Sequence, residues 1–189
     1  MMDKNQNNAK QELTVCFTGH RQIAYGAAMK IPSLLDDVLT ELCERGATTF
    51  RAGGAIGFDT VAALKVLELK ERYPHIRLEL ILPCRNQTEY WEETAVRTYQ
   101  YILNRADSHL FLFDTYFDGC MLERDRCLVE GSDVCVAFCK RSRGGTAYTM
   151  TQALYKAIEN HMLSVMDDSA HDCEHVYRVL YNALEIARG

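Results

Sequence analysis

Residues 48–64 read TTFRAGGAIGFDTVAAL. A β-branched run meets a pair of glycines, and an alanine-rich pattern with helical spacing follows. This order predicts a strand over residues 48–52, a tight turn, and a helix over residues 58–73. The glycines fit neither the dinucleotide pattern G-x-G-x-x-G nor the P-loop, which needs Gly-Lys-Ser/Thr after its glycines. The stretch therefore predicts a strand–turn–helix unit, and the ligand of the turn has to be inferred from the rest of the chain.

The same unit recurs along the chain. Apolar runs predict further strands at residues 13–18, 76–82, 110–113, 134–139 and 162–165. Helical spacing predicts helices at residues 27–45, 90–105, 122–130, 146–160 and 175–187. Strands that alternate with helices through short turns indicate a mostly parallel sheet with helices on both faces. We therefore expect the α/β class and a Rossmann-like three-layer sandwich.

The predicted domain organisation is simple. We expect a flexible leader in residues 1–12, one Rossmann-like domain over residues 13–165, and a linker with a C-terminal helix in residues 166–189. The chain has 189 residues, of which 48% are hydrophobic and 25% charged, as in an ordinary globular domain. No apolar run approaches the roughly 20 residues of a membrane span, and the polar start lacks the core of a signal peptide.

Charge and cysteine content limit the partners. The formal net charge is −5, which gives no general attraction to nucleic acid, so we expect a nucleic-acid partner to be disfavoured. Eight cysteines without a C-x-x-C pattern indicate free thiols in a reducing cytoplasm. The motif HDCEH at residues 171–175 matches the inverted zinc-protease pattern, but it lies in a polar linker and suits a helix start better. We expect no metal and no cofactor.

Basic side chains follow four of the first five predicted strands, and the remaining strand ends in the acidic Asp114. Ligands of open α/β sheets bind outside the carboxyl ends of the strands. Arginine suits phosphate or carboxylate through its planar guanidinium. Each of these arginines alone is explained equally well as a solvated surface residue, but the set predicts a small anionic ligand. The basic residues are His20, Arg21, Arg51, Arg85, Arg141 and Arg143.

Two glycine turns lie at the same predicted edge. The first contains Gly53, Gly54 and Gly57, and the second contains Gly144 and Gly145 followed by Thr146. Each turn precedes a helix, whose N-terminal N–H groups can bind an anion.

Asp59 follows the first turn, where a carboxylate complements the helix dipole by about 0.3–1 kcal/mol. If it has a further role, we expect it near ribose hydroxyls or a base rather than near phosphate.

Three segments together resemble one known family. FTGHR at residues 17–21, GGAIGFDTVAA at residues 53–63 and RSRGGTAYTMTQAL at residues 141–154 are similar to the SLOG superfamily. That group unites the Smf/DprA DNA-processing proteins with the LOG proteins, and the greatest likeness is to its YpsA-like bacterial branch, over residues 13–163. The resemblance implies a Rossmann-like fold that binds nucleotide-derived ligands at the strand ends, and it leaves a homodimer open.

The LOG members of this family hydrolyse the N-glycosidic bond of nucleoside monophosphates with a glutamate in the motif G-G-x-G-T-x-x-E. Here Met150, Thr151 and Gln152 occupy that region, and the glutamate is missing. The departure argues against LOG-type hydrolysis in this chain.

The first hypothesis is therefore a cytoplasmic protein that binds or senses a phosphorylated, nucleoside-like small molecule. The alternatives are a phosphoribohydrolase-like N-glycosidase and a single-stranded DNA-binding protein of the DNA-processing type. Glycosidase chemistry needs a carboxylate, for which we consider Glu89, Glu92 and Asp114, with Tyr90 and Trp91 either stacking a base or packing in the core. The predicted ligand-binding residues are Gly19, His20, Arg21, Arg51, Gly53, Gly54, Gly57, Asp59, Arg85, Gly144, Gly145 and Thr146.

Overall fold

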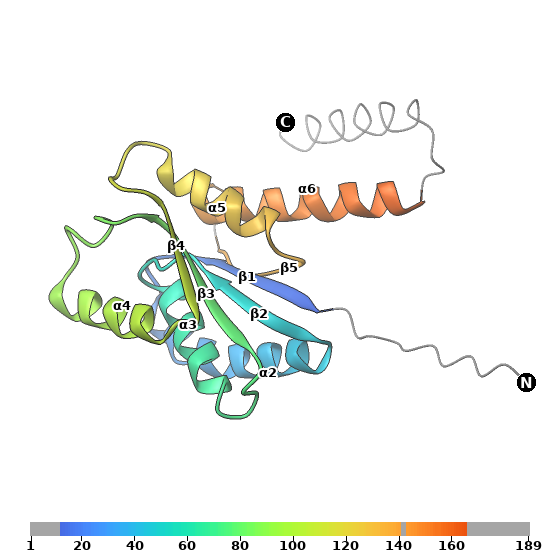
Figure 1. Ribbon diagram of the computed structural model, residues 1–189, viewed down its shortest axis with the longest axis horizontal. Helices are drawn as coiled ribbons and strands as arrows, with labels where there is room; N and C mark the ends of the chain where they lie inside the picture. Colours follow the sequence, from blue (N-terminus) through green and yellow to red (C-terminus); the bar gives the residue numbers. More distant parts are fainter. Residues whose placement is uncertain (1–11, 141–142, 166–189) are drawn as a thin grey trace, which may run out of the picture. The chain divides into compact units, whose positions relative to one another are not determined.

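The structure is a computed structural model that describes residues 12–140 and 143–165. The chain divides into two compact units, Met1–Met150 and Thr151–Gly189, and the first unit holds the sheet. The strands are β1 (Leu13–Gly19), β2 (Ala47–Ala52), β3 (Arg77–Cys84), β4 (Ser108–Phe113) and β5 (Val134–Phe138) (Figure 1). The helices are α1 (Tyr25–Ala28), α2 (Ile31–Glu44), α3 (Phe58–Leu69), α4 (Glu93–Arg105), α5 (Cys120–Glu130) and α6 (Gly145–Val165).

The sheet is parallel throughout. Its five strands are ordered β4-β3-β2-β1-β5, and every neighbouring pair is parallel. The chain therefore adds β2, β3 and β4 on one side of β1 and then returns to place β5 on the other side. In such sheets the ligand crevice lies where the strand order reverses, which here is between β1 and β5.

The two faces of β1 show why helices cover both sides of the sheet. Val15 and Phe17 belong to the main core together with Leu39 of α2, whereas Cys16, between them in sequence, packs with Leu128 of α5. Successive strand residues point to opposite faces, so an uninterrupted apolar strand needs cover on both. Figure 1 shows α2 and α3 on one side of the sheet and α5 on the other. The predicted three-layer α/β sandwich is confirmed.

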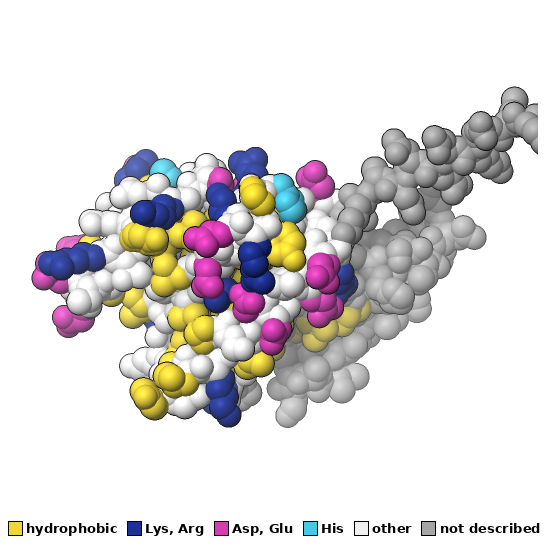
Figure 2. Space-filling model, turned by 90° about the horizontal axis from the view of Figure 1, so that it is seen from below, with side chains coloured by type: hydrophobic (Ala, Val, Ile, Leu, Met, Phe, Trp, Pro, Cys, Tyr) yellow, Lys and Arg dark blue, Asp and Glu magenta, His cyan; other side chains and the backbone are white. Residues whose placement is uncertain are grey.

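Helix α2 lies at the surface of one outer layer. Leu35 and Leu39 are buried, while Leu34 and Val38, one position earlier in each case, are 60% and 41% exposed. Buried residues at a spacing of four form the inner stripe of a surface helix. Figure 2 shows apolar and charged side chains interspersed over the face seen from below.

Several predicted boundaries were wrong. The single helix expected over residues 27–45 is two helices, and Pro32 lies in the first turn of α2, where a missing N–H is tolerated. The strand expected over residues 76–82 continues past Pro83 to Cys84. Its pairing with β2 stops at Leu80, while its pairing with β4 includes both Leu82 and Cys84. The strand expected over residues 162–165 is the end of α6. Periodicity alone does not separate a short apolar strand from part of a helix.

Other predictions fall on residues outside the described ranges. These are the leader, Arg141, the HDCEH motif, and the linker and helix of residues 166–189, so they stay predictions. In residues 12–140 and 143–165, none of the helices combines the length and the apolar character that crossing a membrane requires.

Candidate functional site

A hollow of about 300 Å³ lies at the carboxyl end of β1, where the strand order reverses. Its walls come from the end of β1, the turn before α3, the first turns of α5 and the start of α6. It reaches the lower end of the volume range typical of small-ligand sites, about 300–1,000 Å³. The residues that line this first hollow are Phe17, Thr18, Gly19, His20, Arg21, Ala55, Asp59, Met121, Arg124, Asp125, Gly145 and Thr146.

Two of the predicted glycines shape the hollow by close packing. A Cβ on Gly19 would overlap the side chain of Phe58, and a Cβ on Gly57, whose φ is +89°, would overlap the carbonyl oxygens of His20 and Arg21. The Phe58 N–H donates a 3.1 Å hydrogen bond to the His20 carbonyl. These glycines therefore let the segment after β1 rest directly on the start of α3.

Gly53 makes room for a buried arginine that sequence reading missed. Arg124 of α5 is 7% exposed and donates from Nη1 to the Gly53 carbonyl oxygen. A Cβ on Gly53 would collide with that same guanidinium. The first glycine of the turn is thus explained by Arg124 and not by a ligand. Arg124 lies four residues before the buried Leu128, a spacing that places both on the inner face of α5.

Asp59 is buried beside Arg124. It is 5% exposed, and one of its carboxylate oxygens lies 3.7 Å from Arg124 Nη1. Burial raises the pKa of Asp59 from 3.8 to about 6, the charge of Arg124 opposes this rise, and the charge of Asp125 adds to it. Backbone hydrogen bonds from Ala55 and Gly53 also lower the pKa, so the turn directs these N–H groups at its own carboxylate.

Asp125 lies on the other side of Arg124. Its Oδ1 accepts a 2.7 Å hydrogen bond from Arg124 Nε, and the residue is 8% exposed. Its Oδ2 lies 3.8 Å from the point that a Cβ on Gly145 would occupy. The floor of the hollow is therefore a buried guanidinium between two carboxylates, and the second carboxylate faces the start of α6.

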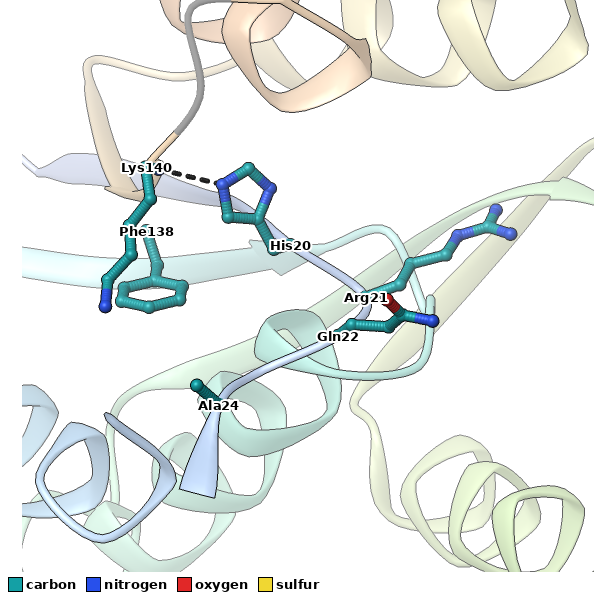
Figure 3. A pocket seen from close by; sticks show the side chains of 6 residues that line it. All are labelled: His20, Arg21, Gln22, Ala24, Phe138 and Lys140. Carbon is teal, nitrogen blue, oxygen red and sulfur yellow. Dashed lines mark hydrogen bonds between the residues drawn. The ribbon is translucent and has the colours of Figure 1, made fainter. Parts of the chain in front are cut away.

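A second hollow of about 430 Å³ shares His20 and Arg21 with the first (Figure 3). His20 Nε2 accepts a 2.8 Å hydrogen bond from the Lys140 N–H, and the His20 ring stands edge-on to Phe138. The Phe138 ring stacks on Phe58 at 5.8 Å, and Lys140 Nζ lies 5.7 Å from the centroid of the Phe138 ring. Figure 3 shows the Arg21 guanidinium pointing away from Phe138. This hollow offers an aromatic side chain next to a cation.

Two cations near the hollows have no acidic partner within residues 12–140 and 143–165. Arg21 Nη2 contacts the Met121 sulfur at 3.8 Å, and Lys140 forms no ion pair with the described residues. Arg124, by contrast, is compensated by its two carboxylates. Among the residues that line the hollows, the positive charge that is available to an anion therefore belongs to Arg21 and Lys140, of which only Arg21 was predicted from the sequence. The predicted Arg143 is exposed and lines neither hollow.

The structure does not bring Arg51 or Arg85 to either hollow. Arg51 Nε donates a 3.1 Å hydrogen bond to Glu79, and its Nη1 donates to the carbonyl of Gly131, beyond the end of α5. Arg85 Nε pairs with Asp114 at 3.1 Å, and its guanidinium also lies over an aromatic ring of β4. Both arginines therefore hold parts of the fold together.

Two further predicted glycines have different surroundings. Gly54 adopts a φ of +65°, and a Cβ on it would overlap Leu82. Its carbonyl accepts a long hydrogen bond of 3.4 Å from Gln87, away from the lining of the first hollow. Gly144 adopts a φ of +106° and accepts the Tyr148 N–H at 3.0 Å, as the residue that precedes α6.

The carboxylates considered for catalysis lie away from the hollows. Glu89 accepts a 3.1 Å hydrogen bond from Asn86, and the Asp114 side chain is 90% exposed. Glu92 is exposed at the N-cap position of α4. Trp91 packs edge-on against Tyr99, with ring centroids 5.7 Å apart. The carboxylates that do line the first hollow are Asp59 and Asp125. Within the described part of the chain, no three His, Cys, Asp or Glu side chains are grouped to hold a metal ion.

Comparison with known proteins gives a family and a fold. A family model described as the YspA SLOG family matches residues 15–168. A UPF0398 protein of Brevibacillus brevis is 30% identical over 135 residues, which are 68% of this chain and 72% of the relative. The SPbeta prophage-derived protein YoqJ of Bacillus subtilis is 25% identical over 136 residues, 66% of this chain and 78% of that protein.

The solved structure of DNA processing protein A from Helicobacter pylori has a similar fold. The TM-score is 0.54 at 21% identity, and the match covers 75% of this chain and 60% of that one. The chain thus spans less than two thirds of the length of this structural relative. At this identity the likeness supports the parallel α/β architecture alone.

Proposed function

Because the chain belongs to the YspA SLOG family, we propose that it binds a phosphorylated, nucleoside-like small molecule in the two hollows at the carboxyl end of β1. The observation that carries the proposal is that the two hollows contain both available positive charge and buried carboxylates. The hollows combine two cations without an acidic partner in the described ranges, Arg21 and Lys140, with two buried carboxylates, Asp59 and Asp125. A ligand that suits both carries an anion and hydroxyl groups.

The anion of such a ligand would lie between Arg21 and the start of α6, at Gly145 and Thr146. The N-terminal turn of a helix attracts negative charge through its N–H groups and its dipole. Two or three charge-assisted hydrogen bonds, each contributing about 1.5–3 kcal/mol, are enough for micromolar affinity, about −8 kcal/mol. The Phe138 ring in the second hollow offers a surface for a base.

Calorimetric titration with adenosine monophosphate, adenosine diphosphate, ADP-ribose and ribose 5-phosphate tests the proposal. We expect a dissociation constant in the micromolar range for at least one of them. Arg21→Ala should weaken binding by about 10- to 100-fold, the loss of one charge-assisted hydrogen bond. The matched control is Arg97→Ala, which removes an exposed arginine paired with Glu93 on α4 and should change the constant by less than about twofold. Absence of binding below about 1 mM for every ligand refutes the proposal.

Hydrolysis of the N-glycosidic bond is a second candidate function, and Asp59 is the observation that favours it. A buried carboxyl group whose pKa is raised to about 6, in a hollow with a second carboxylate, is suited to proton transfer near neutral pH. Release of free adenine from adenosine monophosphate, followed by chromatography, would support this activity if Asp59→Asn abolished it. Intact nucleotide after prolonged incubation with the wild-type protein would exclude it for that substrate.

Single-stranded DNA is a further candidate ligand. The related structure of DNA processing protein A is described by its single-stranded DNA binding mode, and this weakens the prediction, based on a net charge of −5, that nucleic acid is disfavoured. Arg21 and Lys140 would then contact the phosphate backbone. An oligonucleotide gel shift that falls steeply with salt would support DNA binding, whereas no shift at low salt would exclude it.

A further inference from the structure

Asp125 has one carboxylate oxygen engaged and one available. Arg124 Nε occupies Oδ1 at 2.7 Å, while no donor from the described ranges is bonded to Oδ2. The residue is 8% exposed and lines the first hollow. Oδ2 is not fully buried and is open to the hollow, so a ligand group can donate a charge-assisted hydrogen bond to it and gain affinity.

Asp59 differs from Asp125 in this respect. Its carboxylate already receives backbone hydrogen bonds from Gly53 and Ala55 and lies 3.7 Å from Arg124. It therefore has less capacity left for a ligand. Of the two acids in the hollow, Asp125 is the one oriented toward the start of α6, where the proposed anion lies.

An ionised carboxylate only accepts hydrogen bonds, and it repels phosphate. The ligand must therefore present a donor a short distance from its own anion. The hydroxyl groups of a sugar phosphate meet this condition, because they lie a few bonds from the phosphate. Internal nucleotides of single-stranded DNA have no free sugar hydroxyl and cannot meet it through their sugars.

We infer that Asp125 recognises the ribose hydroxyl groups of the ligand, so that the site takes ribonucleotide derivatives in preference to deoxynucleotides. This inference rests on the proposed function, since it assigns the specificity of the same site. Asp125 is thus a specificity-determining residue, and Arg124 holds its carboxylate in place.

The test compares sugars in the unmodified protein first. Titration of ribose 5-phosphate against 2-deoxyribose 5-phosphate, and of adenosine monophosphate against its 2′-deoxy and 3′-deoxy forms, measures the preference for each hydroxyl. We expect at least one deoxy form to bind about tenfold or more weakly, because a site that pairs with a hydroxyl leaves its acceptor unsatisfied when the hydroxyl is missing. The base-free pair separates recognition of the sugar from recognition of a base amino group.

The variant Asp125→Ala then tests whether Asp125 causes the preference for ribo over deoxy sugars. The ratio between ribo and deoxy affinities should fall to about one, whatever happens to the absolute affinity, because the acceptor is gone from both complexes. The matched control is Asp36→Asn, a carboxylate on α2 paired with Arg72 outside both hollows, which should leave the ratio unchanged.

The possible outcomes separate the two proposals. Equal binding of ribo and deoxy forms by the unmodified protein, or an unchanged ratio in Asp125→Ala, overturns the inference and leaves nucleotide binding in place. No binding by any sugar phosphate or nucleotide overturns both. If Asp125→Ala does not fold, the comparison of sugars in the unmodified protein still decides the ligand class.

Discussion

Replacing Asp59 with asparagine should stabilise the folded protein at neutral pH. Burial raises the pKa of Asp59 from 3.8 to about 6, with the attraction of Arg124 already included in that value. Each pKa unit corresponds to about 1.4 kcal/mol, so ionised Asp59 costs the folded state about 3 kcal/mol at pH 7 to 8. Asparagine resembles the protonated acid and avoids most of this cost. The stabilisation by Asp59→Asn should therefore be at most about 3 kcal/mol, because asparagine has one acceptor oxygen for the Gly53 and Ala55 N–H groups instead of two.

The pH dependence follows from the direction of the shift. A carboxyl group whose folded pKa is raised binds its proton more tightly in the folded state. Its contribution to stability is complete below pH 3.8 and is lost as the pH rises through about 6. The advantage of Asp59→Asn over the wild type should therefore be largest above about pH 7 and vanish near pH 4.

Urea unfolding at several pH values measures the free energy of unfolding of the wild type and of Asp59→Asn. Trp91, the only tryptophan in the chain, gives a single fluorescence probe. Asp107→Asn is the control of opposite sign. Burial alone would raise the pKa of Asp107, but hydrogen bonds from Lys70 and the Leu78 N–H, with nearby positive charge, lower it. This variant should lose stability at neutral pH and approach the wild type only as the pH falls below 3.8. A wild-type stability that does not fall between about pH 5 and 7 relative to Asp59→Asn would contradict a raised pKa of Asp59 in the folded protein.

Three further substitutions test the packing around the site. Gly57→Ala should lower the free energy of unfolding by at least about 1–3 kcal/mol, because its φ of +89° is unfavourable for alanine and the Cβ would overlap the Arg21 carbonyl; an unchanged thermal midpoint would contradict this. Arg51→Met should cost about 1–3 kcal/mol through the lost hydrogen bonds to Glu79 and a backbone carbonyl, yet leave nucleotide affinity within about twofold by calorimetry. Phe17→Ala should cost about 3–5 kcal/mol in urea unfolding, because the ring is fully buried in the main core.

Periodicity predicted the layers of the fold because it depends on neighbours in sequence. The apolar run that becomes β1 packs on both faces, and the spacing of Leu35 and Leu39 follows the inner stripe of α2. The order of strands carries no such local signal, so the reversal between β1 and β5 emerged only from the structure. Ligands of open α/β sheets bind at the carboxyl ends of the strands, and this rule selected His20 and Arg21, which line both hollows.

The rule that ligands bind at the carboxyl ends of strands was less informative for side chains that lie within a strand. Arg51 precedes the last residue of β2, and the direction of its side chain is set by the alternation of the strand, which turns it toward Glu79 and Gly131. Arg124 was missed for a different reason. It meets the Gly53 carbonyl from 71 positions further along the chain, and a contact across that separation has no signature in either segment alone.

The turn of Gly53, Gly54 and Gly57 resembles a phosphate-binding loop, but its N–H groups bind a carboxylate of the protein itself. In a phosphate-binding loop the N–H groups face the ligand, whereas here those of Gly53 and Ala55 face Asp59. The anion of this turn is therefore part of the protein, and a second anion at the same N–H groups would be repelled. A ligand phosphate is better placed on the other wall, toward Arg21 and α6, with its neutral hydroxyl groups directed at the acidic floor. The raised pKa of Asp59 agrees with this division, because a strongly shifted pKa in a hollow is more typical of functional sites than of packing cores.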